Sequence, residues 1–304
     1  MVDSNITFSL EDIDAFIFDF DGTLYDFKGL PRHLIFSHPF DMLKMKRERE
    51  ARHALKGCDF GSEEKFWEEY AKALGAGGKN VGGKNSDKNS DKNSDKNSDK
   101  NSDKNDSEGA SEKMLLWYRK NYLPAMVSVL KKYYHARPNT DELFALLKNQ
   151  GKKIVVFSDY GMTKERMEAV GLKVTVTQNP TNRTDCVLNA GDTSDTAKTS
   201  PVSYISTSCS PVGCSPENDK IAIDGIFSAT DFGCLKPAPR PFREIARKIG
   251  VPYEKCLVIG DRNDTDGEGA RQSGMKFLQI KTHKNDGVDF ALLANVFQDS
   301  QKAQ

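Results

Sequence analysis

Short runs of apolar residues, separated by helical patterns, constrain the fold of this chain more than any other sequence feature. The runs are Ala15–Asp19, Lys153–Ser158, Cys256–Gly260 and 276–280, with a weaker candidate at 223–228. A continuous apolar run of this length is typical of a strand that is buried on both faces. Strands that alternate with helices form a parallel sheet, so the sequence predicts an α/β fold, a Rossmann-like parallel sheet covered by helices on both faces. Ligands of such sheets bind at the carboxyl ends of the strands.

Two segments lie outside this pattern. Between residues 84 and 103 the tetrapeptide Lys-Asn-Ser-Asp repeats five times without interruption. A helix would stack like charges four residues apart, and Asn, Ser and Asp are poor residues for a helix interior. Residues 76–111 are therefore predicted to be disordered. Residues 177–219 are rich in Ser, Thr, Asp, Asn and Pro, and are predicted to form a surface insert.

The charges and the ends of the chain argue against several function classes. The 44 basic and 44 acidic side chains cancel, whereas a nucleic-acid binder normally has a basic excess. No basic face is expected to dock on anionic lipid, and no apolar run approaches the ~20 residues of a membrane-spanning helix. The first residues lack the basic and apolar regions of a secretory signal. We therefore expect a cytoplasmic protein with no nucleic-acid or membrane partner and no evident protein partner.

Chemistry-bearing residues follow the strands at the ends where a ligand would bind. Asp19 and Asp21 follow the first strand, Ser158 ends the next, Lys236 precedes a helix, and Asp261 begins an acidic run after a later strand. Clustered carboxylates repel one another unless a cation joins them, and hard oxygen ligands with open positions suit Mg²⁺. One carboxylate could then act as a nucleophile, while the metal, the lysine, a hydroxyl and loop N–H groups offset the charge of a phosphate. The set is therefore sufficient for phosphoryl transfer through an aspartyl-phosphate.

Four stretches resemble the four motifs of the haloacid dehalogenase-like hydrolase superfamily, and they are most similar to its phosphatase branch. They are DFDGTL at 19–24, VVFSDYG at 155–161, LKPAPRPF at 235–242 and IGDRNDTDGEGARQSG at 259–274. All four occur in the family's order and each lies at a strand end, which makes the match specific. The resemblance covers residues 12–25, about 136–176 and 221–298.

The resemblance implies roles for the residues of the first two motifs. Asp19 would be the nucleophile and a Mg²⁺ ligand. Asp21 would be the general acid and base, with its backbone carbonyl on the metal. Ser158 would bind the phosphoryl oxygens together with the turn residues Gly22 and Thr23.

The third and fourth motifs supply the remaining groups. Lys236 would bind substrate and steady the negative charge of Asp19 and of the phosphoryl group. Asp261 would ligate Mg²⁺, and Asp266 would support the metal shell. Asp264 also follows Asp261, and family members vary in this spacing, so either carboxylate fits the motif. Asp266 is preferred because it matches the G-D-x4-D form and begins a predicted helix.

Asp21 bears on the choice between a phosphatase and a dehalogenase. An alkoxide leaving group gains from protonation by a positioned acid, whereas a halide needs none, and the dehalogenase branch resembles this motif without the second Asp. The sequence therefore predicts a Mg²⁺-dependent phosphomonoester hydrolase of a small phosphorylated metabolite. A sugar hydroxyl in place of water would make the same site a phosphomutase or phosphotransferase. A non-catalytic interaction protein that uses its disordered inserts is the alternative from another class.

The resemblance also implies a domain organisation. Residues 26–135 read as helical and resemble the smaller α-helical cap domain that one branch of the family inserts after the first motif. The catalytic core would then be residues 1–25 and 136–304, with the repeat insert inside the cap and the 177–219 insert inside the core. A cap that closes over the site would exclude water and select the substrate.

Overall fold

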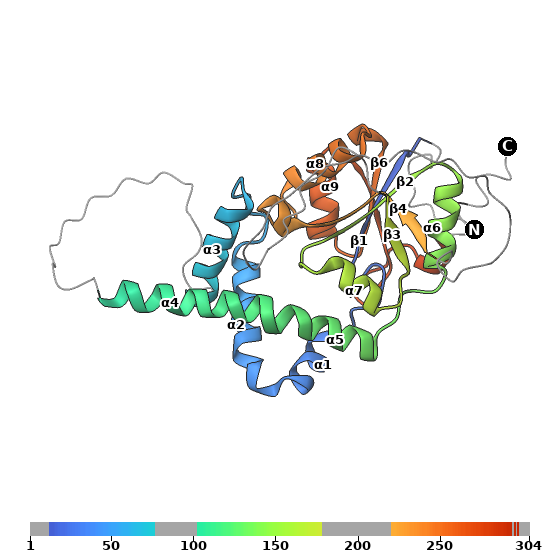
Figure 1. Cartoon of the computed structure of the whole chain (residues 1–304). Coiled ribbons are helices and arrows are strands. Elements are labelled where there is room, and N and C mark those ends of the chain that lie inside the picture. The colour runs from blue at the N-terminus through green and yellow to red at the C-terminus, as the bar shows by residue number, and fades with distance from the viewer. Residues whose placement is uncertain (1–11, 77–101, 178–219, 294, 296, 298–304) are drawn as a thin grey trace, which may run out of the picture.

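A parallel sheet of five strands in the order β5-β2-β1-β6-β7 lies at the centre of the molecule. The computed structural model describes residues 12–76, 102–177, 220–293, 295 and 297. The strands of the sheet are β1 (Ala15–Asp19), β2 (Lys153–Ser158), β5 (Gly225–Ser228), β6 (Cys256–Gly260) and β7 (Lys276–Gln279). The helices that pack on it are α6 (Thr140–Asn149), α7 (Thr163–Ala169), α8 (Pro239–Ile249) and α9 (Glu268–Gln272) (Figure 1).

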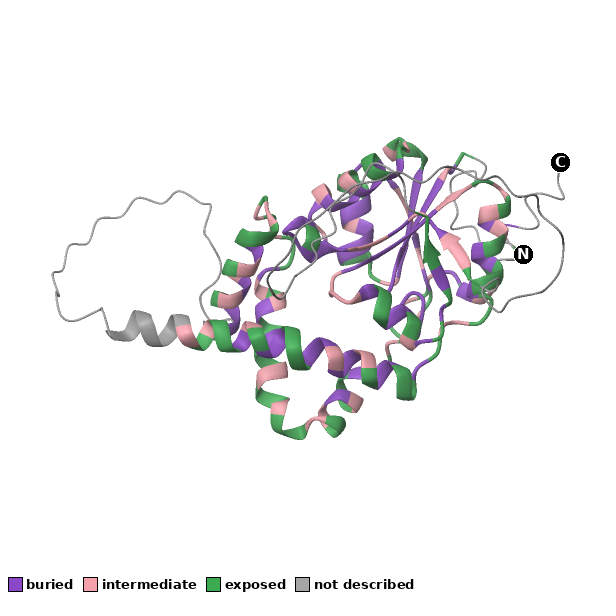
Figure 2. Cartoon of the chain, viewed as in Figure 1, coloured by how far each residue is buried: buried purple, intermediate pink, exposed green. Residues whose placement is uncertain are grey.

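The two faces of the sheet are covered by separate apolar clusters, as the continuous apolar strands require. Phe18 of β1 packs on Phe144 of α6, with ring centroids 5.0 Å apart. Its neighbour Ile17 shares the opposite cluster with Phe242 of α8. Successive side chains of a strand point to opposite faces, so both faces need apolar residues at every position. Figure 2 shows the resulting buried centre with exposed outer helix surfaces, and the predicted α/β fold is confirmed.

The strand order brings the predicted site residues to one edge of the sheet. The chain goes from β1 to β2 on one side and later returns to β6 on the other side, so the order reverses at β1. Asp19 lies in register with Phe157, and Phe18 with Ile259. Ligands of open α/β sheets bind at such a reversal, outside the carboxyl ends of the strands. Asp19, the last residue of β1, lies at this point.

A helical unit, α1 to α5, lies beside this edge of the sheet (Figure 1). Its elements are α1 (Leu30–Ser37), α2 (Met42–Ala54), α3 (Glu63–Ala76), α4 (Ser102–Trp117), a π-helical turn (Tyr118–Tyr122) and α5 (Leu123–Tyr133). The sequence predicts a kink or a restart at Pro124. The restart is confirmed: Pro124 lies in the first turn of α5, directly after the π-helical turn, where the missing N–H of a proline is tolerated.

Several boundaries differ from those that the sequence predicts. The sequence predicts a helix over residues 111–134, whereas α4 begins at Ser102, so residues 102–111 are helical although the sequence places them in the disordered insert. No individual helix is predicted from the sequence at residues 30–37, where α1 forms, although the region 26–135 as a whole reads as helical. Residues 77–101 and 178–219, which hold most of the two predicted inserts, lie outside the described residues. Within the described part of the chain, no helix combines the length and apolar character needed to cross a membrane.

The strand expected at residues 223–228 is divided at Asp224. β4 (Ile221–Ile223) pairs with β3 (Val174–Val176) in a small parallel sheet, and β5 joins the main one. The Asp224 carboxylate accepts hydrogen bonds from the Ile154 N–H, at 2.9 Å, and from Lys148 Nζ, at 2.9 Å. These bonds hold Asp224 at the start of β2. The residues before Asp224 therefore pair with β3, and the residues after it pair with β2.

Candidate functional site

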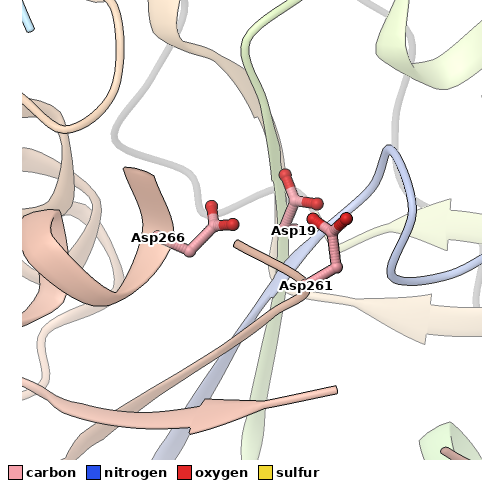
Figure 3. Close-up of side chains that lie close together, drawn as sticks. All are labelled: Asp19, Asp261 and Asp266. Atoms are coloured by element: carbon pink, nitrogen blue, oxygen red, sulfur yellow. The ribbon is translucent and has the colours of Figure 1, made fainter. Parts of the chain in front are cut away.

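Three carboxylates meet at the carboxyl edge of the sheet. Asp19 ends β1, Asp261 directly follows β6, and Asp266 lies in the π-helical turn Asn263–Gly267 that leads into α9. Each offers one oxygen such that the three oxygens lie within 4.8 Å of one another (Figure 3). Asp19 and Asp266 are buried. The structure therefore brings together the acidic residues of the first and fourth motifs.

Lys236 is the buried cation of this cluster. Its Nζ donates to Asp19 Oδ1 at 2.7 Å, to Asp266 Oδ1 at 2.8 Å and to the carbonyl oxygen of Phe157 at 2.9 Å. Burial alone would lower the pKa of Lys236, but the adjacent carboxylates raise it above its ordinary value. An ammonium has three donors, and all three are used. Lys236 is therefore held charged and in one orientation.

One ammonium does not balance three carboxylates, and the carboxyl pKa values reflect this. Burial, followed by the charge of Asp266, raises the pKa of Asp19 well above its ordinary value. The same two causes raise the pKa of Asp261 to about 7. Asp261 Oδ1 is also buried without a hydrogen-bond partner. An orphaned buried oxygen among excess carboxylates fits a hard divalent cation that takes oxygen ligands.

The surroundings of Asp261 fix it in place. Its backbone carbonyl accepts hydrogen bonds from Gln279 Nε2 at 3.0 Å and from Asn285 Nδ2 at 2.8 Å. Gly22 has φ +94°, and a Cβ there would lie 2.5 Å from Asp261 Oδ2. Only glycine permits both this backbone conformation and this approach. Gly22, predicted to bind substrate, thus lies directly against a predicted metal ligand.

The predicted nucleophile is also held at its second oxygen. The Thr23 hydroxyl donates to Asp19 Oδ2 at 3.0 Å, while Lys236 holds Oδ1. Thr23 is fully buried, and its single hydroxyl proton is committed to Asp19. The described contacts therefore give Thr23, which the sequence predicts to bind substrate, a role in orienting Asp19.

Asp21 has a different environment from Asp19. Both its oxygens accept from Arg166 Nη1, at 2.7 and 2.8 Å. Tyr25 donates to Oδ1 at 2.6 Å, and Ser158 donates to Oδ2 at 2.8 Å. Burial would raise the pKa of Asp21, but the charge and hydrogen bonds of Arg166 outweigh it and lower that pKa. Asp21 is therefore held as a carboxylate.

The two acidic candidates of the fourth motif lie in different environments. Asp266 is 2% exposed and belongs to the buried cluster. The Asp264 side chain is 57% exposed and forms ion pairs with Lys56 of the helical unit and with Arg262. Both agree with the motif spacing, but only Asp266 shares Lys236 with Asp19.

A cavity of about 620 Å³ opens over the cluster. Its walls include Asp19, Asp21, Lys236, Asp261 and Asp266 from the sheet edge. Arg52 and Phe27 contribute from the segment between β1 and α6, and Tyr160 from the loop after β2. Ser158, Gly22 and Thr23 are not among the lining residues; they lie behind the carboxylates that they contact.

Sequence reasoning missed Arg166, Tyr25 and Arg52. Arg166 contacts Asp21 across 145 positions of sequence, and an arginine in a short helix gives no signal that it is buried. Arg52 Nη1 donates to the carbonyl of Asp159 at 3.0 Å, and its guanidinium lies 3.9 Å from the Tyr160 ring centroid. It thereby joins the helical unit to the loop after β2. Of these three residues, only Tyr25 lies next to a recognised motif, because it directly follows DFDGTL, so the sequence could have placed it near the site.

Comparisons with known proteins match part of this chain, and the family match contains the third and fourth motifs. A family model described as HAD-hydrolase-like matches residues 233–296. A glyceraldehyde 3-phosphate phosphatase of Methanopyrus kandleri is 41% identical over 64 residues, which are 21% of this chain and 28% of that protein. A phospholysine phosphohistidine inorganic pyrophosphate phosphatase of Rattus norvegicus is 35% identical over 69 residues, 20% of this chain and 26% of that protein.

The extent of these matches is limited. The matches span less than a third of the length of either curated relative. Among solved structures, a 2-haloacid dehalogenase of Pseudomonas syringae is 12% identical with a TM-score of 0.46, covering 96% of this chain and 99% of that one. The family match at residues 233–296 contains Lys236, Asp261 and Asp266. The matched sequence thus supplies three of the groups that the fold gathers around Asp19, and this part of the chain is similar to HAD-like hydrolases.

Proposed function

We propose that this protein is a Mg²⁺-dependent phosphatase that hydrolyses the phosphomonoester of a small metabolite through an aspartyl-phosphate on Asp19. The observation that carries the proposal is the setting of Asp19, which lines the cavity beside Asp261 and Asp266 with Lys236 Nζ 2.7 Å from its Oδ1. The two curated relatives are phosphatases by name, which supports the reaction class. The cavity, of about 620 Å³, has the size of a small-molecule site.

Asp19, Asp261, Asp266 and the Asp21 carbonyl are the groups that would hold the metal. When bound, Mg²⁺ would offset the negative charge of phosphate and carboxylate as they approach. Lys236 contributes a fixed positive charge to the same end, and the Thr23 hydroxyl keeps Asp19 oriented. Such preorganised charges lower the barrier because they need no rearrangement during the reaction.

The reaction has two halves. In the first, an Asp19 oxygen forms a bond to phosphorus, the bond to the ester oxygen breaks, and Asp21 gives a proton to the leaving alkoxide. Because the resting structure holds Asp21 as a carboxylate, this proton comes from solvent in the first turnover, and in later turnovers from the water that Asp21 deprotonates in the second half. In the second, Asp21 takes a proton from water as the water oxygen bonds to phosphorus and the Asp19–phosphorus bond breaks. Phosphate leaves, and Asp19 is restored. The low pKa of Asp21 in the resting structure suits the base of the second half.

The substrate would enter between the core and the helical unit. We propose that residues 26–135 act as a cap, because Arg52 of α2 lines the cavity and contacts the loop after β2. Lys56, just after α2, pairs with Asp264 at the cavity wall. These contacts join the helical unit to both sides of the catalytic edge, where closure would exclude water.

The proposal is tested by a phosphate-release screen over sugar phosphates, nucleotides and small acid phosphates, with Mg²⁺ and with a chelator. We expect release with at least one substrate in Mg²⁺ and none in the chelator. Asp19→Asn should be inactive, while the exposed Asp286→Asn is the matched control and should be active. Transfer of phosphate to a sugar hydroxyl without release would indicate a mutase. Equal inactivity of wild type and Asp19→Asn over the whole panel would overturn the enzyme proposal.

A further inference from the structure

Arg166 of α7 is a fully buried arginine that contacts two of the predicted catalytic groups. Its side chain is 0% exposed. Besides both oxygens of Asp21, it donates from Nη2 to the Ser158 hydroxyl at 2.6 Å and to the Tyr160 carbonyl at 3.0 Å. Its Nε donates to the Gly161 carbonyl at 3.1 Å. A guanidinium has five N–H donors in a fixed plane, and these five bonds account for all of them.

The partner carboxylate is saturated in the same way. An ionised carboxylate offers about four lone-pair sites. Asp21 fills two with Arg166, one with Tyr25 and one with Ser158. As long as the four bonds remain, Asp21 can neither rotate nor accept a proton from water. One of its bonds must be released before it can act on a substrate.

The Ser158 hydroxyl identifies the bond that can be released. Its oxygen accepts from Arg166 Nη2 and from the Tyr160 N–H, at 2.6 and 3.1 Å. A hydroxyl has one proton and two lone pairs, so its proton is directed to Asp21. If that proton turns to a phosphoryl oxygen, a lone pair of Asp21 Oδ2 becomes free. Arg166 and Tyr25 would continue to hold the carboxylate.

We propose that Arg166 is a positioning residue of the proposed phosphatase, which orients Asp21 through both oxygens and directs the proton of Ser158. The inference rests on the proposed function, since it assigns Arg166 to the chemistry of that site. Nη1 contacts both oxygens of Asp21 while Nη2 donates to the Ser158 hydroxyl, and the planar guanidinium keeps these two nitrogens in one fixed arrangement. A lysine would retain the charge but not this geometry.

The alternative is that Arg166 only balances a buried charge. Removing one partner of a buried ion pair destabilises a protein whether or not the pair serves catalysis. The test therefore needs a readout that stability alone does not change. Rescue by free guanidinium gives such a readout, because the small cation restores the missing contacts without restoring the side-chain stem.

We would compare wild type, Arg166→Ala, Arg166→Lys and Asp21→Asn with the best substrate of the phosphate-release screen. For Arg166→Ala we expect kcat to fall about 10²-fold, as for a misplaced catalytic group, with little change in KM. Guanidinium at tens of millimolar should raise its kcat about tenfold towards wild type. The same concentration should leave wild type and Asp21→Asn unchanged. Arg166→Lys should resemble Arg166→Ala in kcat while its melting temperature is closer to that of wild type.

Other results would overturn the inference. These are a kcat of Arg166→Ala or Arg166→Lys near that of wild type, or an Arg166→Ala that is folded by its melting curve, inactive and not rescued. If Arg166→Ala does not fold, the kcat of Arg166→Lys is the test: a value about 10²-fold below wild type supports the inference, and a value near wild type overturns it. A wild type inactive on every phosphate ester would instead count against the proposed function, so the two failures are distinguishable.

Discussion

The ammonium of Lys236 lies 2.7 Å from Asp19 Oδ1, although 217 positions separate the two residues in the sequence. A buried carboxylate at a strand tip is unfavourable without an opposite charge. Lys236 supplies that charge and also holds Asp266. The contact joins the first and third motifs, so it forms only when the two halves of the core have folded together.

Lys236→Met would remove the positive charge and leave the carboxylates to repel one another. We expect the variant to lose activity and, in a chelator, to unfold with a free energy lower by about 3–5 kcal/mol, the usual cost of unpairing a buried charge. Mg²⁺ should recover part of the stability, because a cation offsets the same repulsion, but not the activity. Thermal unfolding with and without Mg²⁺, alongside phosphate release, checks this. Equal stability of variant and wild type in the chelator would refute it.

Asp266→Asn and Asp264→Asn separate the two readings of the fourth motif. Asp266 is buried in the carboxylate cluster, whereas Asp264 is exposed and paired with Lys56. We expect Asp266→Asn to raise the Mg²⁺ concentration needed for half-maximal activity by about 10–100-fold, as for other groups that support a metal site. Asp264→Asn should change it only slightly. The reverse order in a magnesium titration of phosphate release would assign the motif to Asp264.

The contacts of Asp224, which lies away from the site, predict that the stability of the fold depends on pH. Burial acts to raise its pKa, but the Ile154 N–H together with Lys148 and Lys153 lowers it below the ordinary value. Because the pKa of Asp224 is lower in the folded than in the unfolded protein, its carboxylate contributes fully to the free energy of unfolding above the unfolded pKa, about 3.9. This contribution is lost as the pH falls through the folded pKa. At pH near 7, Asp224→Asn should cost about 1–3 kcal/mol.

Urea unfolding at neutral pH and below pH ~4 measures this difference. The difference in the free energy of unfolding between wild type and Asp224→Asn should be smaller at the lower pH. The exposed Asp286→Asn controls for the loss of a surface charge and should show no such change. A gap of the same size at both pH values would show that the carboxylate charge is not what stabilises this junction between β4 and β5.

The ion pair between Arg52 and Glu48 is expected to stabilise the helical unit. Arg52 Nε lies 2.9 Å from Glu48 Oε1, and the Glu48 side chain is 1% exposed. Arg52→Met should cost about 3–5 kcal/mol because it leaves the buried Glu48 without an opposite charge, with only the Tyr70 hydroxyl donating to it. Lys46→Met is the matched control: Lys46 pairs with Glu50 at 3.9 Å on the surface, and its loss should cost less than about 0.5 kcal/mol. Similar unfolding free energies for the two variants would contradict this account.

The sequence predicts the core well where one local signal dominates. β1, β2 and β6 are continuous apolar runs of five or six residues between helical patterns, which is typical of strands buried on both faces. Their carboxyl ends then place Asp19, Asp261 and Asp266 together, because parallel strands share one edge. The sequence does not reveal the break at Asp224, since Ile-Ala-Ile-Asp-Gly-Ile-Phe-Ser has only one charge and the partner groups lie on other elements.

The remaining differences arise from contacts between distant residues. Residues 102–111 have no apolar face that would predict a helix, yet α4 extends through them, and α4 packs against α3. Arginine is a residue type that usually lies at the surface. Arg166 is buried because Asp21, Ser158 and two backbone carbonyls accept hydrogen bonds from all its donors. The sequence assigns Ser158 to the phosphoryl group, whereas the resting structure directs its proton to Asp21. Such pairings depend on the folded loop after β2 and leave no local pattern.

The proposed covalent intermediate on Asp19 is tested directly by mass spectrometry of enzyme quenched in acid during turnover. We expect the peptide containing Asp19 to gain one phosphoryl group in the presence of substrate and Mg²⁺, and the same peptide of Asp19→Asn to gain none. Phosphate release by an enzyme that carries no phosphoryl group, or that carries it on another residue, would rule out an aspartyl-phosphate on Asp19.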